Sequence, residues 1–324
     1  MESISAPASI RGGDSDGSDT DEQENWGLAI HGIPIDKEAQ QSAVLVQKPQ
    51  RAHGPPLLRY VVRRDYAAPI DNPRRILDIG SKDGAWIRNM SAQFPSCKVR
   101  GCEGFLVGDK GMPPLPHNCR IDLIDLCKRF PYGDGQFDYI HQRLMGFYTS
   151  IEMWALRMRD IYRMLSPGGY VELVELDPDP VHCGQSAMAV NGWIKEKLLG
   201  NGIDLGAVRY LDKLLRLAGF TDIHHHAVEV PMGGGTLARG QVMLRLVNLI
   251  YSSIYGALLD EASKSKTGEA ATTAMPKGHE RDSVMELSSS WEDCHDLMDA
   301  AQDEFEANRT SVIFRFYWAR KPLE

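Results

Sequence analysis

A short apolar strand that runs into a glycine turn constrains the fold of this chain more than any other feature. The residues from Ile76 to Ile79 predict a buried strand, and Gly80 and Gly84 allow a tight turn and close approach of the backbone to a ligand. A strand, turn and helix in this order are typical of the turns that bind nucleotide cofactors. Lys82 stands where such turns usually have their middle glycine.

Length and composition exclude several kinds of protein. The 324 residues are 43% hydrophobic, which is enough for a sizeable core in one large domain or two small ones. The net charge of −8 argues against binding to nucleic acid, and no apolar run reaches the length of a membrane span. The cysteines include no CxxC pair, so we expect reduced thiols and no metal site. These features predict a protein of the cytoplasm, or of the nucleus, without a nucleic-acid or membrane partner.

The chain divides into three parts by composition. Residues 1–24 are rich in Ser, Gly, Asp and Glu and cannot bury enough apolar surface to offset the entropy of ordering, which predicts a disordered acidic tail. Residues 25–70 are mixed in character and predict an N-terminal helical cap. Residues 71–324 hold the main domain, with a cap or lid insertion around 231–285.

Strand patterns alternate with helical patterns along the main domain. The turn at 166–169 is expected to end one helix and to lead into the next strand. This alternation predicts an α/β fold, with a doubly wound, mostly parallel seven-stranded sheet and helical cap elements. The expected strands are 75–79, 98–102, 119–123, 137–141, 169–176, 221–230 and 311–319, and the expected helices include 86–94, 151–165, 190–199 and 209–218.

The ligand of such a sheet lies beyond the carboxyl ends of the strands, near the point where the strand order reverses. Glu103 follows the second expected strand, where a carboxylate can accept hydrogen bonds from ribose hydroxyls. A glycine turn with a later acidic residue also suits an NAD-type oxidoreductase, so the turn alone leaves the cofactor open.

Five short segments, in their order and spacing, narrow this choice. They are 68–70, 72–80, 137–143, 167–173 and 318–322. Together they resemble the class I S-adenosylmethionine-dependent methyltransferases, and most closely the fungal LaeA-like (UMTA-type) methyltransferases of secondary metabolism. The resemblance covers most of residues 26–324. It implies a Rossmann-like methyltransferase fold with S-adenosyl-L-methionine as the cofactor, and it disfavours the oxidoreductase.

The resemblance also implies which residues bind the cofactor. Glu103, with Gly104 after it, would bind the ribose hydroxyls, and Asp125 with the backbone of Leu126 would meet the adenine. His141, on the fourth strand, would sit beside the transferable methyl, and the glycine turn would surround the methionine part. The implied cofactor residues are Asp78, Gly80, Ser81, Gly84, Glu103, Gly104, Asp125, Leu126 and His141.

Methyl transfer to a hydroxyl also needs a group that removes the proton of the acceptor. His141 is the candidate base by position, although a histidine that only hydrogen-bonds the cofactor or the backbone would explain the residue equally well. Glu175 and His182, at and beyond the end of the fifth strand, are further candidates on the acceptor side. We expect no metal at 224–226, where three histidines are adjacent, because neighbouring strand residues point to opposite faces.

Two functions remain open after these arguments. The leading interpretation is a S-adenosylmethionine-dependent methyltransferase that acts on a small-molecule acceptor of secondary metabolism. The alternative is a LaeA-like regulatory protein that acts through a partner protein, with weak or absent methyl transfer. The acidic tail and Lys82 favour the alternative, whereas the retained Gly80, Gly84 and Glu103 favour the enzyme.

Lys82 itself allows two interpretations. Its side chain either points to solvent beside Asp83 or obstructs the ligand at a position of close approach. We expect the first, so Lys82→Gly should leave the affinity for S-adenosylmethionine within about tenfold, or roughly 1.4 kcal/mol. Calorimetric titration of both proteins measures this difference. A much larger gain in affinity would mean that the lysine blocks the site.

Overall fold

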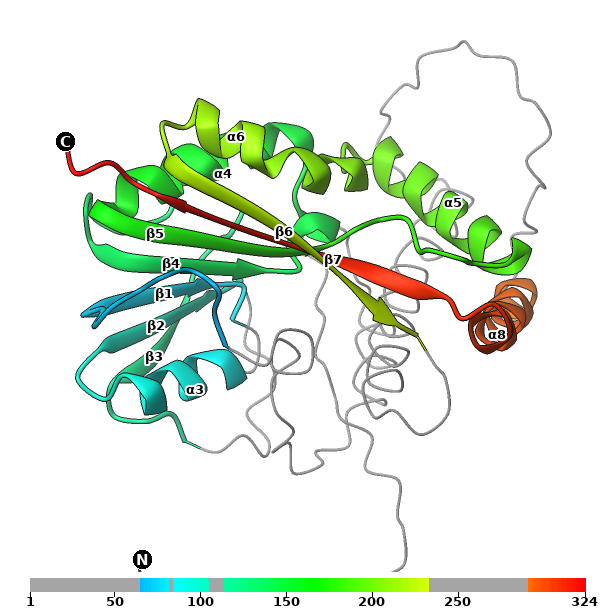
Figure 1. Ribbon diagram of the computed structural model, residues 1–324, viewed down its shortest axis with the longest axis horizontal. Helices are drawn as coiled ribbons and strands as arrows, with labels where there is room; N and C mark the ends of the chain where they lie inside the picture. Colours follow the sequence, from blue (N-terminus) through cyan, green and yellow to red (C-terminus); the bar gives the residue numbers. More distant parts are fainter. Residues whose placement is uncertain (1–64, 82–83, 105–113, 233–290) are drawn as a thin grey trace, which may run out of the picture.

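The computed structural model describes residues 65–81, 84–104, 114–232 and 291–324 (Figure 1). The predicted tail 1–24, nearly all of the predicted cap 25–70 and lid 231–285, and Lys82 lie outside these residues. Residues 65–70, the described end of the predicted cap, contain no helix. In the part of the chain that the structure describes, no helix is both long and apolar enough to cross a membrane.

The described residues form one sheet with helices against it. Two short 3₁₀ helices, η1 (Gly146–Tyr148) and η2 (Leu205–Tyr210), join the larger elements. The strands are β1 (Arg75–Ile79), β2 (Lys98–Glu103), β3 (Cys119–Leu123), β4 (Phe137–Arg143), β5 (Leu165–Leu176), β6 (Thr221–Pro231) and β7 (Ser311–Arg320). The α-helices are α3 (Ala85–Gln93), α4 (Ile151–Met164), α5 (Gln185–Gly200), α6 (Leu211–Leu217) and α8 (Trp291–Ala307).

The sheet has the strand order β3-β2-β1-β4-β5-β7-β6. Strands β1 to β5 pair in parallel, whereas β7 runs antiparallel between β5 and β6. The prediction of a doubly wound, mostly parallel seven-stranded sheet is therefore confirmed. Because β1 lies between β2 and β4, the strand order reverses at the end of β1, where the glycine turn begins.

The core lies between the sheet and its helices. Strands β1 and β4 are almost wholly buried and present apolar side chains to both faces, as expected for parallel strands covered on both sides. Helix α3 packs against β2 and β3, while α4 packs against β5 and α6 against β6 and β7 (Figure 1). The largest fully buried side chains are Trp86, Trp154, Tyr139, Tyr317, Phe137, Phe314 and Phe316.

Two element boundaries differ from the predictions because distant residues set them. Helix α5 begins at Gln185, before the predicted start at 190, because Glu304 of α8 accepts hydrogen bonds from the backbone amides of Ser186 and Ala187. Strand β5 begins at Leu165, so the predicted turn at 166–169 is an irregular start of that strand. Hydrogen bonds between Lys321 and this segment hold it in the sheet.

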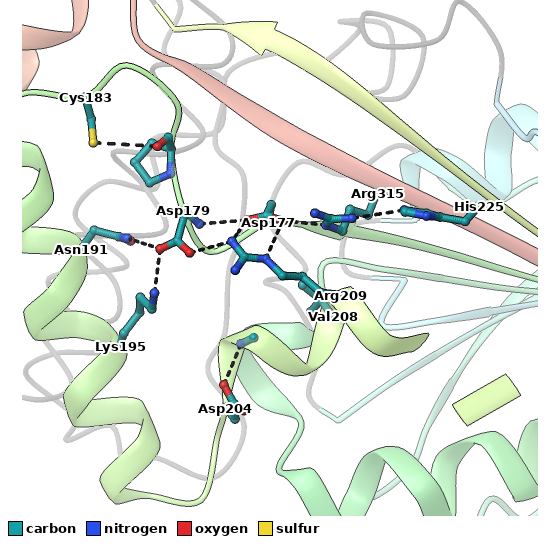
Figure 2. A network of polar contacts seen from close by, with 12 residues as sticks. Asp177, Asp179, Cys183, Asn191, Lys195, Asp204, Val208, Arg209, His225 and Arg315 are labelled. Carbon is teal, nitrogen blue, oxygen red and sulfur yellow. Dashed lines mark hydrogen bonds and ion pairs between the residues drawn. The ribbon is translucent and has the colours of Figure 1, made fainter. Parts of the chain in front are cut away.

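An ion-pair network fixes the chain at the end of β5 (Figure 2). Oδ2 of Asp177 accepts from Nε of Arg209 in η2 at 3.0 Å and from Nε of Arg315 in β7 at 2.6 Å. Asp179 accepts from Nη2 of Arg209 and from Nζ of Lys195 in α5, both at 2.6 Å. The network therefore joins the end of β5 to η2, α5 and β7.

The charge state of Asp177 follows from these contacts. Burial raises the pKa of the carboxyl group, but the hydrogen bonds from Arg209, from the backbone of Asp179 and from Arg315 outweigh burial and hold the pKa below its usual value. Asp177 is thus ionised at neutral pH, and its ion pairs contribute to stability there.

We predict that Asp177→Asn lowers the free energy of unfolding by about 2–4 kcal/mol at pH 7, because two arginines lose their buried anion while the partial exposure of Arg209 limits the loss. The pKa of Asp177 is lower in the folded state, so the contribution is complete above the unfolded-state pKa and declines as the pH falls below about 4. Urea denaturation at pH 7 and pH 3 measures both effects, with the exposed Asp222→Asn as the control. An equal loss at the two pH values would contradict this account.

Candidate active site

The glycine turn after β1 is held against the end of β2. The carbonyl of Cys102 accepts hydrogen bonds from the backbone amides of Gly80 at 3.0 Å and Ser81 at 3.2 Å. Gly80 and Gly84 both have a φ of +73°, in the left-handed region that favours glycine. A β-carbon at Gly80 would also lie only 2.7 Å from Sδ of Met145. Backbone conformation and the contact with Met145 therefore both require glycine at position 80.

A buried hydroxyl lies beneath this turn. Ser81 is buried, and its Oγ has no hydrogen-bond partner among the residues that the structure describes. The hydroxyl packs over Gly101 of β2, where a β-carbon would come within 2.3 Å of Oγ. An unsatisfied buried hydroxyl costs about 1–3 kcal/mol, so such a group usually meets a water or a ligand. The turn thus offers a polar contact to a bound molecule.

The acidic residues predicted after β2 and β3 both lie at the carboxyl edge of the sheet. Glu103 ends β2 and is 4% exposed, and its Oε1 accepts from the backbone amide of Gly104 at 3.0 Å. Asp125 is exposed; its Oδ1 accepts from the amide of Cys127 at 2.9 Å and its Oδ2 lies 3.2 Å from Nζ of Lys128. Leu126 is buried. Glu103 therefore lies beside the glycine turn, whereas Asp125 lies in the loop after β3.

His141 lies inside strand β4, with its ring against helix α3. It is 0% exposed, and its Nδ1 lies 2.7 Å from Oδ1 of Asp78. Its ring stacks on Trp86 of α3, with centroids 4.1 Å apart and planes 6° from parallel. Strand β4 continues for two more residues to Arg143, so His141 sits within the sheet under α3. Trp86 covers one face of the ring and Asp78 engages Nδ1, while the role of His141 as a general base beside the methyl stays a prediction.

Glu175 is an anchor for the chain after β4. It is 1% exposed, and its two carboxylate oxygens accept from the backbone amides of Met145 at 3.1 Å and Gly146 at 2.9 Å. These amides begin η1, where a carboxylate satisfies donors that have no helical partner. Both oxygens of Glu175 are thus buried and engaged by backbone amides, and its role as the group that removes a proton from the acceptor stays a prediction. His182, the other candidate, is exposed in the loop after β5.

Tyr148 is a buried residue near the candidate site that the sequence did not indicate. It ends η1 at the carboxyl edge of the sheet, and burial, with the nearby carboxylates of Glu103 and Glu175, raises the pKa of its hydroxyl well above the usual value. The hydroxyl therefore keeps its proton at neutral pH and can donate a hydrogen bond. No local pattern marks this residue, since Glu175 positions η1 from another strand.

The histidines at 224–226 do not converge. His224 stacks on Trp318 and His225 on Tyr317, two neighbouring residues of β7 that face opposite sides of the sheet. Among the residues with described coordinates, no three His, Cys, Asp or Glu side chains gather as metal ligands would.

A separate cavity lies along the outer side of α4. It has a volume of about 280 Å³ and contains no residue of the glycine turn and neither Glu103 nor Tyr148. Its walls are Cys127, Lys128, Arg129, Phe130, Met153, Leu156, Arg157, Arg159, Asp160 and Arg163. The strand order and the glycine turn place the candidate site at the carboxyl edge instead.

Comparison with known families decides the class of protein. The family model described as a methyltransferase domain matches residues 56–225, just over half of the chain. The chain belongs to this methyltransferase family. The match includes the glycine turn, Glu103, Asp125 and η1, so every feature of the carboxyl edge described above falls within the methyltransferase domain. Fold and family agree with the predicted S-adenosylmethionine-dependent methyltransferase.

Curated fungal relatives of this methyltransferase confirm the resemblance to the LaeA-like proteins. It is 32% identical over 158 residues to the secondary metabolism regulator laeA of Coprinopsis cinerea, across 47% of this chain and 37% of that protein. It is 25% identical over 182 residues to the methyltransferase cpsF of Aspergillus campestris, across 52% of this chain and 63% of that protein. The methyltransferase thus spans between about a third and two thirds of the length of these relatives.

Solved structures that resemble the methyltransferase include a phosphoethanolamine N-methyltransferase of Haemonchus contortus in complex with S-adenosyl-L-methionine. The sequence identity is 16% and the TM-score is 0.43, with 79% of this chain and 50% of that chain covered.

We predict that Glu175→Gln lowers the free energy of unfolding by about 1–3 kcal/mol, because an amide nitrogen cannot accept a hydrogen bond and one backbone amide at the start of η1 loses its partner. Denaturant unfolding measures the change. Glu152→Gln, an exposed residue in the first turn of α4, serves as the matched control. Equal stability of Glu175→Gln and wild type would show that Glu175 does not anchor η1.

Proposed function

We propose that the protein is a S-adenosylmethionine-dependent methyltransferase that binds its cofactor at the carboxyl ends of β1 and β2 and methylates a small-molecule acceptor. The observation that carries this proposal is the glycine turn, whose two glycines adopt left-handed conformations at the point where the strand order reverses. Glu103 lies buried at the end of the neighbouring strand. These are the positions where a nucleoside cofactor binds in doubly wound sheets.

The residues at this edge fit the chemical groups of S-adenosylmethionine. Ser81 presents a buried hydroxyl without a protein partner in the described residues, which suits the polar methionine part. Asp78, Gly80 and Gly84 complete that part of the site, Glu103 and Gly104 would accept the ribose, and Asp125 and Leu126 would accept the adenine. The match of residue type to chemical group supports the proposal without placing the cofactor.

Methyl transfer requires little covalent chemistry from the protein. S-adenosylmethionine supplies an electrophilic methyl on a sulfonium, and the protein must align the acceptor with it. The chain between β4 and α4 borders the turn, since Met145 contacts Gly80 and Tyr148 follows in η1. We propose that these residues form the wall on the acceptor side, with the Tyr148 hydroxyl as a hydrogen-bond donor to the acceptor.

The names of the relatives favour two classes of function. The relatives cpsF and str3, the latter from Strobilurus tenacellus, are named methyltransferases, which supports catalysis of methyl transfer. The relatives laeA and LAE1, the latter from Cochliobolus heterostrophus, are named secondary metabolism regulators, which supports regulation as the second candidate. The glycine turn and the buried Glu103 at the carboxyl edge favour the enzyme.

We predict that the wild type binds S-adenosylmethionine and S-adenosylhomocysteine, and that Glu103→Gln weakens both by about tenfold or more, because the ribose hydroxyls lose a charged acceptor. Isothermal titration calorimetry measures both affinities. The exposed Glu152→Gln should bind like the wild type.

Two outcomes would contradict the proposal at different points. Absence of binding heat at millimolar cofactor would exclude the enzyme and leave the regulatory candidate. Binding that Glu103→Gln does not change would keep the enzyme and refute the ribose assignment.

A further inference from the structure

Three ionisable side chains form one row across the middle of the sheet. The register pairs Asp78 of β1 with His141 of β4, and His141 with Glu172 of β5. All three are buried, and His141 stacks on Trp86 of α3. Because residues in register share a face, the imidazole lies between two carboxylates. A buried charged row of this kind needs partners for its polar atoms.

The two carboxylates in this row have different partners, and Oε1 of Glu172 has none among the described residues. Oε2 of Glu172 accepts from the backbone amides of Ala67 at 2.8 Å and Ala68 at 2.7 Å, and from the hydroxyl of Tyr139 at 3.0 Å. Glu172 therefore fixes the segment that precedes β1. Asp78 makes a single hydrogen bond in the described part of the chain, to Nδ1 of His141 through Oδ1.

The second oxygen of Asp78 remains available to a ligand. Oδ2 has no hydrogen-bond partner among the described residues, and the side chain keeps 5% exposure although the strand around it is buried. Asp78 lies two residues before Gly80, at the start of the glycine turn. Its place beside the turn makes Oδ2 the carboxylate oxygen that a ligand of the proposed cofactor site can meet, whereas Oδ1 is engaged by His141.

The imidazole of His141 is fixed in one orientation. Trp86 stacks on one face of the ring, and the indole nitrogen of Trp86 donates to the backbone oxygen of Asp65 at 2.8 Å, which fixes Trp86 in turn. Nε2 of His141 has no partner in the described residues, so Nδ1 makes the directed contact of this side chain. Nδ1 is the ring nitrogen that faces Asp78.

We propose that His141 is a positioning residue for the cofactor: its Nδ1–H holds Oδ1 of Asp78 so that Oδ2 accepts a hydrogen bond from the ammonium group of the methionine part. This inference rests on the proposed function. The positioning role differs from the predicted role of His141 as a base, and it is compatible with the full burial of the ring. No bond is broken, and the proton stays on Nδ1 throughout.

Two amide substitutions of His141 test whether a donor at the position of Nδ1 is what Asp78 requires. Asn places its Nδ2 close to the position of histidine Nδ1, whereas the longer Gln places its amide near the position of Nε2 and away from Asp78. Both remove the ring that stacks on Trp86, so both should lower the melting temperature to a similar degree. The pair therefore separates the hydrogen bond from the packing.

We predict that His141→Asn binds S-adenosylhomocysteine within about threefold of the wild type, while His141→Gln binds it about tenfold or more weakly. Calorimetry measures the dissociation constants, and thermal unfolding measures the stability of each variant. Gln142→Leu is the matched control, since Gln142 is equally buried in β4 but faces the other side of the sheet. It should bind like the wild type.

Several results would overturn the inference. Equal affinities of the Asn and Gln variants, or affinities that follow the melting temperatures of all three variants, would assign His141 a purely structural role. Failure of the wild type to bind would instead refute the proposed function, so the two failures are distinguishable.

A measurement on the wild type covers the case in which the variants do not fold. In protein with ¹⁵N-labelled histidine, the Nδ1–H resonance of the fully buried His141 should shift when S-adenosylhomocysteine is added. Cofactor binding with no change in that resonance would overturn the proposal.

Discussion

The parallel pairing of β1 with both β2 and β4 is the constraint on which the rest of the structure depends. It places the end of β1 in the centre of the sheet, where the chain must leave the strand in a narrow space. Gly80 turns there because its conformation is left-handed and because Met145 occupies the space of a side chain. The same pairing brings Glu103 and Met145 to the two sides of the turn.

Buried carboxylates then fix the segments that leave the sheet. Glu172 holds the chain that enters β1, Glu175 holds the chain that leaves β4, and Asp177 holds η2 and β7. Each is nearly inaccessible to solvent, and each accepts hydrogen bonds from backbone amides or from arginine. The acidic groups in and just after strand β5 thus fix the segments around the site.

The strands, turns and helices that depend on local sequence pattern could be predicted accurately. The strands around Ile76 and Tyr139, the glycine turn and the helix at α4 follow from apolar periodicity and turn residues, and the structure confirms them. The roles of His141 and Glu175 could not be predicted in this way, because strand register decides their partners. The early start of α5 could not be predicted either, because the carboxylate that accepts from the amide of Ser186 belongs to Glu304, 118 residues away.

The position of β7 has a consequence for folding. It is the last strand along the chain, yet it separates β5 from β6 and supplies Arg315 to Asp177. Until β7 is in place, β6 has no neighbour in the sheet and β5 presents an unpaired edge. Contacts between strands so distant in sequence form slowly, and an open edge recruits strands from other molecules. Intermediates that contain only β1 to β5 are therefore the species most prone to aggregate, and the docking of β7 removes the open edge of β5.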